Sequence, residues 1–318
     1  MSIKGNIRRI LFSVLPISLY LKVVYRYLHG GKLDLFEPKK FSEKLFWLKL
    51  YNGQENKKVM QLCYDKFDAR RYIEEKIGPG YLPELYGIYD DVDDIDFSIF
   101  PEKYVIKITQ SCGYNIINNG ELEMSQEKIM EQLRKWQQEI NDLSECRKRY
   151  KEESYYYTGK AKIICEEYLE DSNSDIVTDS AFFCFNGEPK YYDIVYDSVK
   201  LGDGLKSEEL FYRNIYDIDK QYIPMELGRP TDEKLGNKNF ENFNKMIEIS
   251  ERLSKDFPFL RVDLYNIEGR IVVGELTWIP MGGGGKITPE EFDYEWGKLL
   301  KLPDVKIDFK NYKRCLPK

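Results

Sequence analysis

The sequence predicts an α+β fold, and two observations support this prediction. Helix and strand patterns are mixed along the chain without the strict alternation of βαβ units, which disfavours a doubly wound parallel sheet. Two pairs of strands are each separated by a short turn and therefore predict antiparallel hairpins. The chain has 318 residues, of which 42% are hydrophobic and 32% charged, so it can bury a sizeable core as an ordinary globular protein.

Charge and rare residues exclude several kinds of function. The net charge is −6, and the basic residues are spread along the chain rather than gathered in a patch, so we expect no nucleic-acid partner. The six cysteines form no C-x-x-C pair, which is typical of reduced thiols, and we expect a cytoplasmic protein. His29 is the only histidine, which disfavours a zinc site and a histidine-based catalytic triad.

Residues 1–50 are predicted to form a helical N-terminal extension. An apolar stretch at residues 10–28 is interrupted by a proline and two basic residues, so it is too short to span a membrane. It also lacks the cleavage site of a signal peptide. Two interpretations remain open: a helix packed on the protein body, or an amphipathic helix over residues 7–28 lying on the inner face of a membrane. In the second, four cations would meet anionic lipid: Arg8, Arg9, Lys22 and Arg26.

Apolar residues at helical spacing predict four helices. Ser42 is a candidate N-cap for the first, and the Gly78-Pro79-Gly80 sequence ends the second. The acidic residues 90–98 predict a solvated loop or a short helix. The four helices are predicted at residues 39–51, 55–77, 125–149 and 239–255.

Strand patterns complete the predicted elements. A strand at residues 104–108 is followed by a turn at Ser111–Gly113, and residues 162–169 predict a buried strand with a polar end. Asn186-Gly187 is a strong hairpin turn, and a second hairpin closes near Glu268-Gly269. The hairpin strands are predicted at residues 180–185, 190–195, 261–266 and 270–277.

The second hairpin predicts a magnesium site. A turn at Glu268-Gly269 places Asp263 opposite, or nearly opposite, Gly274-Glu275, so two carboxylates can share one cation. Strand alternation puts Arg261 on the face of Asp263, and Thr277 on the face of Glu275. The alternative is an ordinary hairpin whose charges face water. Two clustered carboxylates repel each other without a cation, so removing one should preserve or raise the stability of the ligand-free chain.

A run of glycines follows this hairpin directly. Gly282, Gly283, Gly284 and Gly285 precede Lys286, and consecutive glycines let backbone N–H groups approach an anion closely. The run does not match the P-loop pattern. We expect a binding loop rather than a flexible linker, because the run begins immediately after the acidic strand.

Two lysines and one strand end are further candidates. Lys107 lies within an apolar strand, where a lysine either reaches solvent or meets an anion. Lys66 belongs to a helical pattern, and most helix lysines lie at the surface. Glu166 to Leu169 end a buried strand, where backbone groups can bind an adenine edge. The alternative is an edge strand with solvated glutamates.

Together these pieces resemble the ATP-grasp superfamily, and most closely its teichuronopeptide-biosynthesis, or TupA-like, branch. The similarity extends from about Lys32 to Pro303. It is carried by the stretches FSEKLFWLKLY, YDKFDARRYIEEKIG, KIICEEYLED, FFCFNG and LSKDFPFLRVDLYN…GELT.

The resemblance implies an ATP-grasp fold in which two α+β subdomains clasp the nucleotide. The catalytic region would cover residues 51–318, after the N-terminal extension. Its parts would be a pre-grasp part at 51–103, a first subdomain at 104–165 and a second subdomain with the metal site at 166–318.

It also implies roles for single residues. Lys66 and Lys107 correspond to the lysines that hold the ATP phosphates. Arg261 resembles the arginine that stabilises the transferred phosphate and the tetrahedral intermediate. The remaining roles are the adenine hinge at Glu166, Glu167, Tyr168 and Leu169, ribose contact by Asp179, Mg²⁺ ligation by Asp263, Glu275 and Thr277, and positioning of the acceptor carboxylate by Gly282–Gly285.

Three departures from the family pattern affect these roles. Thr277 stands where the wider superfamily usually has asparagine, although a hydroxyl can still bind a metal. Ala181 stands where relatives tend to have lysine, and Gln110-Ser111-Cys112 where they tend to have His-Asp-Ser. The last two weaken the expected phosphate and substrate contacts, and they indicate a different acceptor or a partly degenerate enzyme.

The resemblance implies a carboxylate–amine ligase that uses ATP and Mg²⁺. The substrates would be a uronic-acid carboxylate of a surface polysaccharide or its precursor and an amino acid or similar amine. One alternative is a glycosyltransferase of capsule assembly, for which Asp217-Ile218-Asp219 is a candidate metal motif. Another is a degenerate ATP-grasp module that binds polysaccharide without turnover. The sequence does not indicate the oligomeric state.

Overall fold

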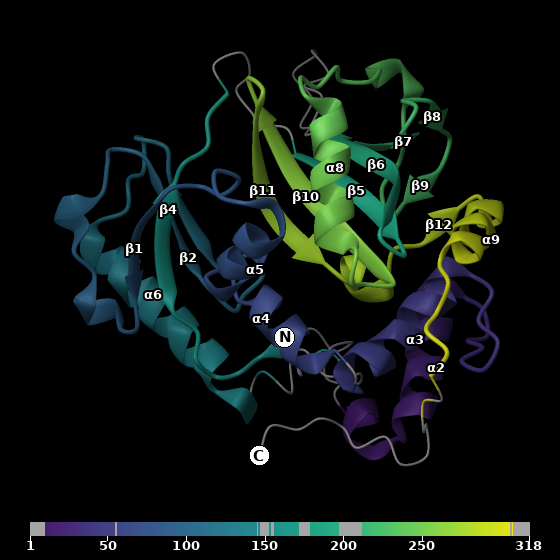
Figure 1. The fold of residues 1–318 in the computed structure, drawn as a ribbon. Helices are drawn as coiled ribbons and strands as arrows, with labels where there is room; N and C mark the ends of the chain where they lie inside the picture. Colours follow the sequence, from purple (N-terminus) through teal and green to yellow (C-terminus); the bar gives the residue numbers. More distant parts are fainter. Residues whose placement is uncertain are drawn as a thin grey trace, which may run out of the picture. The chain divides into compact units, whose positions relative to one another are not determined.

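The computed structural model describes residues 10–54, 56–144, 146, 153, 156–171, 179–196, 212–305 and 307. The chain forms two compact units (Figure 1). The first comprises Met1–Tyr20, Lys49–Glu170 and Ile307–Lys318, and the second Leu21–Leu48 and Asp171–Lys306. Part of the predicted N-terminal extension thus belongs to the second unit, and the domain boundaries given above stay predictions.

The first unit contains a four-stranded antiparallel sheet of order β1-β4-β2-β3. Helix α6 contacts β2, and its residues Ile129, Leu133 and Ile140 recur at helical spacing and are fully buried or nearly so. The elements are α4 (Lys57–Tyr64), α5 (Asp68–Ile77), β1 (Leu85–Tyr89), η1 (Val92–Asp94), η2 (Phe97–Ile99), β2 (Tyr104–Ile108), β3 (Asn115–Asn118), α6 (Gln126–Asn141) and β4 (Ile163–Glu167).

The predicted single helix at 55–77 is wrong, because the chain breaks it at Asp65. The buried Asp65 carboxylate accepts hydrogen bonds from the backbone N–H groups of Phe67 at 2.9 Å and Asp68 at 3.2 Å. These bonds satisfy donors at the start of α5 and leave Lys66 in the turn between α4 and α5. The predicted single helix at 125–149 is also interrupted, because α6 ends at Asn141 and Asp142 is not helical; residues 145 and 147–149 of this prediction lie outside the described residues.

The second unit is built on a six-stranded antiparallel sheet of order β11-β10-β5-β6-β7-β8. Both predicted hairpins are confirmed. Asn186 and Gly187 have φ values of 51° and 84°, and Glu268 and Gly269 have φ values of 51° and 85°, as tight hairpin turns require. The strands are β5 (Asp179–Phe185), β6 (Glu188–Tyr196), β7 (Tyr212–Asp217), β8 (Tyr222–Ile223), β9 (Glu226–Leu227), β10 (Phe259–Ile267), β11 (Arg270–Thr277) and β12 (Ile287–Thr288), where β9 pairs with β12.

Helix α8 (Phe243–Ser254) covers one face of this sheet and packs against β5, β6 and β10 (Figure 1). Phe182 of β5 meets Phe243 of α8 with ring centres 5.8 Å apart, so Phe182 and its neighbour Val262 point toward α8. Strand alternation therefore sends Arg261 and Asp263 to the opposite face.

Helices α2 (Ile17–His29) and α3 (Phe41–Gln54), which contribute to both units, meet α9 (Glu290–Leu299) through a buried polar cluster. The Ser42 hydroxyl donates to Asp293 at 2.6 Å and lies 2.9 Å from the Tyr25 hydroxyl. Ser42 is therefore not the predicted cap of α3; instead Glu43 accepts from the N–H groups of Lys39 and Lys40. None of the helices among the described residues is long and apolar enough to cross a membrane.

Candidate functional site

The hairpin of β10 and β11 gathers four predicted site residues. Asp263 pairs with Glu275, and Arg261 pairs with Thr277, which confirms the predicted register. A bulge between Asp263 and Leu264 follows this pair and shifts the rest of the ladder. The four side chains lie on the sheet face opposite α8.

Arg261 forms the centre of this cluster. Its Nε donates to Asp263 Oδ1 at 2.7 Å and one terminal nitrogen to Oδ2 at 2.5 Å, which makes the pair bidentate. The same nitrogen donates to the Thr277 hydroxyl at 3.2 Å and lies 3.7 Å from Glu275 Oε2. Burial lowers the pKa of Arg261, but the Asp263 charge outweighs this effect and raises the pKa above its ordinary value. The guanidinium is therefore permanently charged.

The cluster has one buried side and one exposed side. The Asp263 side chain is 10% exposed, whereas that of Glu275 is 58% exposed. No group of three or more carboxylate, histidine or cysteine side chains among the described residues has the geometry of a metal site. The donor set of two carboxylates and a hydroxyl nevertheless fits Mg²⁺, which commonly takes one or two carboxylates and completes its shell with phosphate oxygens and water.

A second charge pair lies on the same sheet and was missed by the sequence analysis. The buried Asp193 of β6 accepts from the N–H of Ala181 at 3.0 Å and lies 3.0 Å from Nε of Arg213 in β7. Arg213 also donates to the carbonyl of Leu227 at 3.0 Å. Burial raises the pKa of Asp193, while the charges of Arg213 and Arg261 act against this rise.

This pair gives the departure at Ala181 a structural context. Ala181 lies between Asp263 on β10 and Asp193 on β6. Where relatives tend to have a lysine between these two positions, this chain has only a small apolar side chain. Arg213 supplies a cation to Asp193, and Arg261 supplies one to Asp263. The charged residues Asp193 in β6 and Arg213 in β7 were the available signal, but single charges in strands are common at surfaces.

The glycine run forms an ordered turn rather than a linker. Residues Pro280–Gly283 form the short helix η5, in which Met281 and Gly282 have φ values of 50° and 58°. His29 at the end of α2 donates from Nε2 to the Gly283 carbonyl at 2.9 Å. The single histidine thus has a structural role in holding this loop.

In the first unit, Lys107 points to the strand end that was predicted as the adenine hinge. Its Nζ pairs with the Glu166 carboxylate, and Arg70 lies 3.8 Å from the other oxygen of Glu166. The Glu166 side chain is 7% exposed, so it holds two cations and is not a solvated edge residue. Arg70 was not among the predicted site residues.

Lys66 lies beside the end of β2. Its N–H donates to the Thr109 carbonyl at 3.0 Å, and its Nζ donates to the Ser111 carbonyl. The structure thus places Lys66 at the loop that follows the strand of Lys107.

The unusual loop at Gln110-Ser111-Cys112 is held by its own contacts. Gln110 donates to Asp65 at 3.1 Å and to Thr158 at 2.7 Å, and the Ser111 hydroxyl donates to the Ile108 carbonyl at 2.8 Å. Both side chains are buried. These residues support the turn that contains Lys66.

The rest of the predicted hinge is partly described. Glu167 accepts from the N–H of Glu84 at 3.0 Å, and Tyr168 and Leu169 are half-buried just beyond the end of β4. The side chain of Asp179 lies outside the described residues, so its ribose contact stays a prediction. The residues of the predicted hinge and both lysines belong to the first unit, and the hairpin of β10 and β11 and the glycine loop belong to the second.

Comparison with known families decides what kind of protein carries this site. The sequence model of the family described as TupA-like ATPgrasp matches residues 43–301. The chain belongs to this family. The match includes all the candidate site residues on both units, and it confirms the resemblance drawn from the sequence.

This TupA-like ATP-grasp chain is also similar to several solved ligases. A D-alanine–D-alanine ligase from Bacillus anthracis has a TM-score of 0.41 and 13% identity, covering 69% of this chain and 58% of that one. The Helicobacter pylori enzyme of the same name has a TM-score of 0.39 and 13% identity, covering 77% and 60%. N5-carboxyaminoimidazole ribonucleotide synthetase from Thermus thermophilus has a TM-score of 0.35 and 10% identity, covering 70% and 46%. The chain spans less than two thirds of each structure, and no curated protein matches it.

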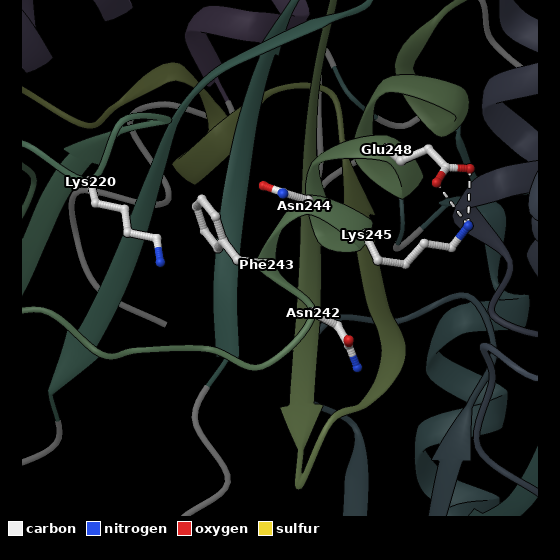
Figure 2. Close-up of a pocket in the computed structure, with 6 residues that line it drawn as sticks. All are labelled: Lys220, Asn242, Phe243, Asn244, Lys245 and Glu248. Atoms are coloured by element: carbon white, nitrogen blue, oxygen red, sulfur yellow. Dashed lines mark hydrogen bonds and ion pairs between the residues drawn. The ribbon is translucent and has the colours of Figure 1, made fainter.

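A pocket of the ATP-grasp chain lies apart from these residues, at the start of α8 (Figure 2). It has a volume of about 540 Å³. Lys220 lies with its Nζ 4.8 Å from the centre of the Phe243 ring, and Lys245 pairs with Glu248 at 2.9 Å. The pocket contains no predicted site residue and lies on the α8 side of the sheet, so it is not the candidate active site. Its lining residues are Lys220, Asn242, Phe243, Asn244, Lys245 and Glu248.

Proposed function

We propose that this protein is an ATP-dependent carboxylate–amine ligase. The observation that carries the proposal is the Arg261, Asp263, Glu275 and Thr277 cluster, found at the predicted positions of a chain that belongs to an ATP-grasp family. An arginine, two carboxylates and a hydroxyl on one sheet face suit the binding of a metal and the stabilisation of a transferred phosphoryl group.

The proposed reaction has two steps. A carboxylate oxygen of the acceptor attacks the γ-phosphorus of ATP, which forms an acyl phosphate and releases ADP. An amine nitrogen then attacks the acyl carbon, loses a proton and expels inorganic phosphate, so that an amide bond forms. Each turnover therefore releases one ADP and one phosphate for each amide.

Different residues of this chain would bind the metal, bind the phosphates and stabilise the transferred charge. Asp263, Glu275 and Thr277 would hold Mg²⁺, which supplies positive charge against the phosphate oxygens when it is bound. Lys66 and Lys107 would bind the phosphates of the nucleotide. Lys107 would have to leave its salt bridge with Glu166 to do so. Arg261 would stabilise the charge that develops during transfer.

We infer that Arg213 and Asp193 support this arrangement. Asp193 places a buried negative charge near Arg261, and Arg213 neutralises part of it.

The substrates are proposed from the family resemblance. They are a uronic-acid carboxylate of a surface polysaccharide or its precursor and an amino acid or similar amine, joined in the cytoplasm. The glycosyltransferase alternative is not favoured by any contact, because Asp217 accepts from the N–H of Gln221 at 2.8 Å and serves the β7–β8 turn. A degenerate binding module would bind the saccharide without turnover of ATP, so a measurement of ATP turnover distinguishes it from the ligase.

A release assay tests the proposal. The protein is incubated with Mg²⁺, ATP and pairwise mixtures of amino acids and uronic-acid saccharides, and ADP and phosphate are measured together. The expected result is equal release of both products that depends on both substrates and falls about a hundredfold in Glu275→Gln. Saccharide binding without any ADP release in all mixtures would support the binding module instead.

A further inference from the structure

Helix α2 exposes a continuous apolar and basic face. Leu19, Val23 and Tyr27 recur every four residues and are 46%, 38% and 68% exposed. Lys22 and Arg26 lie between them on the same side and are also exposed. We name these five residues the α2 face.

The opposite side of α2 fixes the orientation of this face. Tyr20, Leu21, Val24 and Tyr25 are all at most 5% exposed, and Tyr25 contacts Ser42 and Phe46 of α3. The helix therefore packs on the body, as the first of the two sequence interpretations expected. Packing leaves the α2 face outward, so the two interpretations are compatible.

Exposed apolar side chains are concentrated in the segment of the chain that contains this helix. Ile10 and Val14, in the helical residues 10–14, are 58% and 67% exposed, and Phe36 is 77% exposed. Six of the twelve large hydrophobic side chains that the described residues expose therefore lie between Ile10 and Phe36. Single exposed apolar residues are ordinary, but such a concentration indicates an interaction surface.

The charge of α2 favours an anionic partner. Helix α2 contains two basic residues on its exposed face and no acidic residue. Asp34 interacts electrostatically with Lys22, but its pKa is lowered chiefly by hydrogen bonds from the N–H groups of Glu37 and Phe36 and to a smaller extent by Lys22. Asp34 is thus held mainly by its own loop, and the face keeps a positive charge.

We propose that the α2 face docks on an anionic lipid surface. Apolar side chains at a helix surface enter the boundary between head groups and acyl chains, lysine and arginine beside them meet anionic head groups, and tyrosine favours this interface. Arg8 and Arg9, which lie outside the described residues, are not needed for the proposal. It is independent of the proposed ligase activity, because none of the α2 face residues belongs to the candidate site.

Docking would bring one functional element toward the lipid. His29, two residues beyond Tyr27, holds the glycine loop through Gly283. A lipid-bound α2 therefore keeps this loop near the membrane surface, where a membrane-borne acceptor would be presented.

Vesicle co-sedimentation of the full chain tests the proposal. Vesicles of phosphatidylcholine alone are compared with vesicles that also contain phosphatidylglycerol. We expect binding to the anionic vesicles, and a loss of at least about tenfold in a Leu19→Ser, Val23→Ser, Tyr27→Ser triple variant. A Lys22→Gln, Arg26→Gln double variant should lose roughly tenfold on anionic vesicles, and salt should weaken wild-type binding.

Matched controls keep the test specific. An Ile99→Ser, Ile117→Ser variant removes two comparably exposed apolar side chains elsewhere, and Lys245→Gln, Arg252→Gln removes two cations of α8 that pair with Glu248. Both should bind vesicles like the wild type. Tyr27→Ser alone, at the most exposed position of the face, provides a variant that should fold if the triple variant does not.

Three results would overturn the proposal. The first is no difference between neutral and anionic vesicles, and the second is unchanged binding by the folded triple or Tyr27→Ser variant. The third is absence of vesicle binding by the wild type, together with self-association of the wild type that the triple variant loses, which would make the α2 face a protein interface. Truncation of residues 7–28 is unsuitable, because it would remove the buried side of α2 as well.

Discussion

Arg261 and Asp263 are bound to each other in the ligand-free chain, and this pairing changes the expected effect of a substitution. Sequence reasoning treats Asp263 and Glu275 as two carboxylates that repel each other, so that removing either should not harm stability. The structure corrects this expectation for Asp263, because a buried guanidinium already neutralises it. Glu275 is exposed and lies 3.7 Å from Arg261, so its substitution should change the stability of the chain little.

The Asp263→Asn and Glu275→Gln variants should therefore differ in stability but not in activity. Asp263→Asn leaves a buried arginine without its partner and should cost roughly 3 kcal/mol of unfolding free energy. Glu275→Gln should stay within about 0.5 kcal/mol of the wild type. Both should lower ADP release about a hundredfold. Chemical denaturation and the release assay measure the two effects, and wild-type turnover in both variants would remove the metal role of this hairpin.

His29 should make stability depend on pH. Burial lowers the pKa of its ring, with Lys40 and Lys286 acting in the same direction and Gly283 and Asp293 against it. In the unfolded chain the histidine has a pKa of about 6.5. Between this pKa and the lower pKa of the folded state, the unfolded chain binds a proton that the folded chain does not bind. Stability is thus highest above this pKa and falls as the pH drops through it toward the lower pKa of the folded state.

The measurement is the melting temperature as a function of pH for the wild type and His29→Gln. Glutamine keeps a hydrogen-bond donor for Gly283 and removes the titration, so its curve should be flatter below neutral pH. Asp293, whose pKa burial raises, gains stability as the pH falls, but it is present in both proteins and does not account for the difference. Parallel curves would show that His29 is not the titrating group.

At the scale of elements, the sequence predicts what local patterns determine. The turns at Asn186-Gly187 and Glu268-Gly269 fix their hairpins, and the second places Asp263 opposite Glu275. The break between α4 and α5 could not be predicted in this way. It depends on Asp65, which binds Thr109 at 2.7 Å across more than forty residues of chain as well as its own turn.

The Asp193–Arg213 pair was missed for a related reason. A charged residue in a strand pattern indicates a solvated face unless its partner is known, and the partner here lies on the next strand beyond a segment outside the described residues. Lys107 was chosen as a candidate because its strand is otherwise apolar. Its partner Glu166 follows from the pairing of β2 with β4, which the sequence does not show.

Helix α9 offers an element-scale test through Gly297. A Cβ at this position would lie 2.0 Å from the Lys39 carbonyl oxygen, so the side chain has no room beside the backbone at 39–40. Gly297→Ala should move α9 and cost roughly 1–3 kcal/mol. In the control, Gly31→Ala, the nearest atom would be Tyr25 Cε1 at 3.9 Å, and stability should be nearly unchanged. Thermal melting compares the two, and equal melting temperatures would contradict the close packing.

For the whole molecule, the two units divide the candidate residues between them. Lys66, Lys107 and the hinge after β4 belong to one unit, and Arg261 with its partners belongs to the other. The match to the TupA-like ATP-grasp family includes the candidate residues of both units. The proposal therefore requires that the chain bind ATP with Mg²⁺.

Nucleotide-dependent thermal stability tests this claim most directly. A ligand that binds only the folded state at about a hundred times its Kd adds roughly 2.7 kcal/mol of stability, which raises the melting temperature by several degrees in a chain of this size. We expect this rise with ATP or ADP and Mg²⁺, a smaller rise in Lys107→Met, and none with UDP-sugars. A rise with UDP-sugars and none with adenine nucleotides would contradict the account.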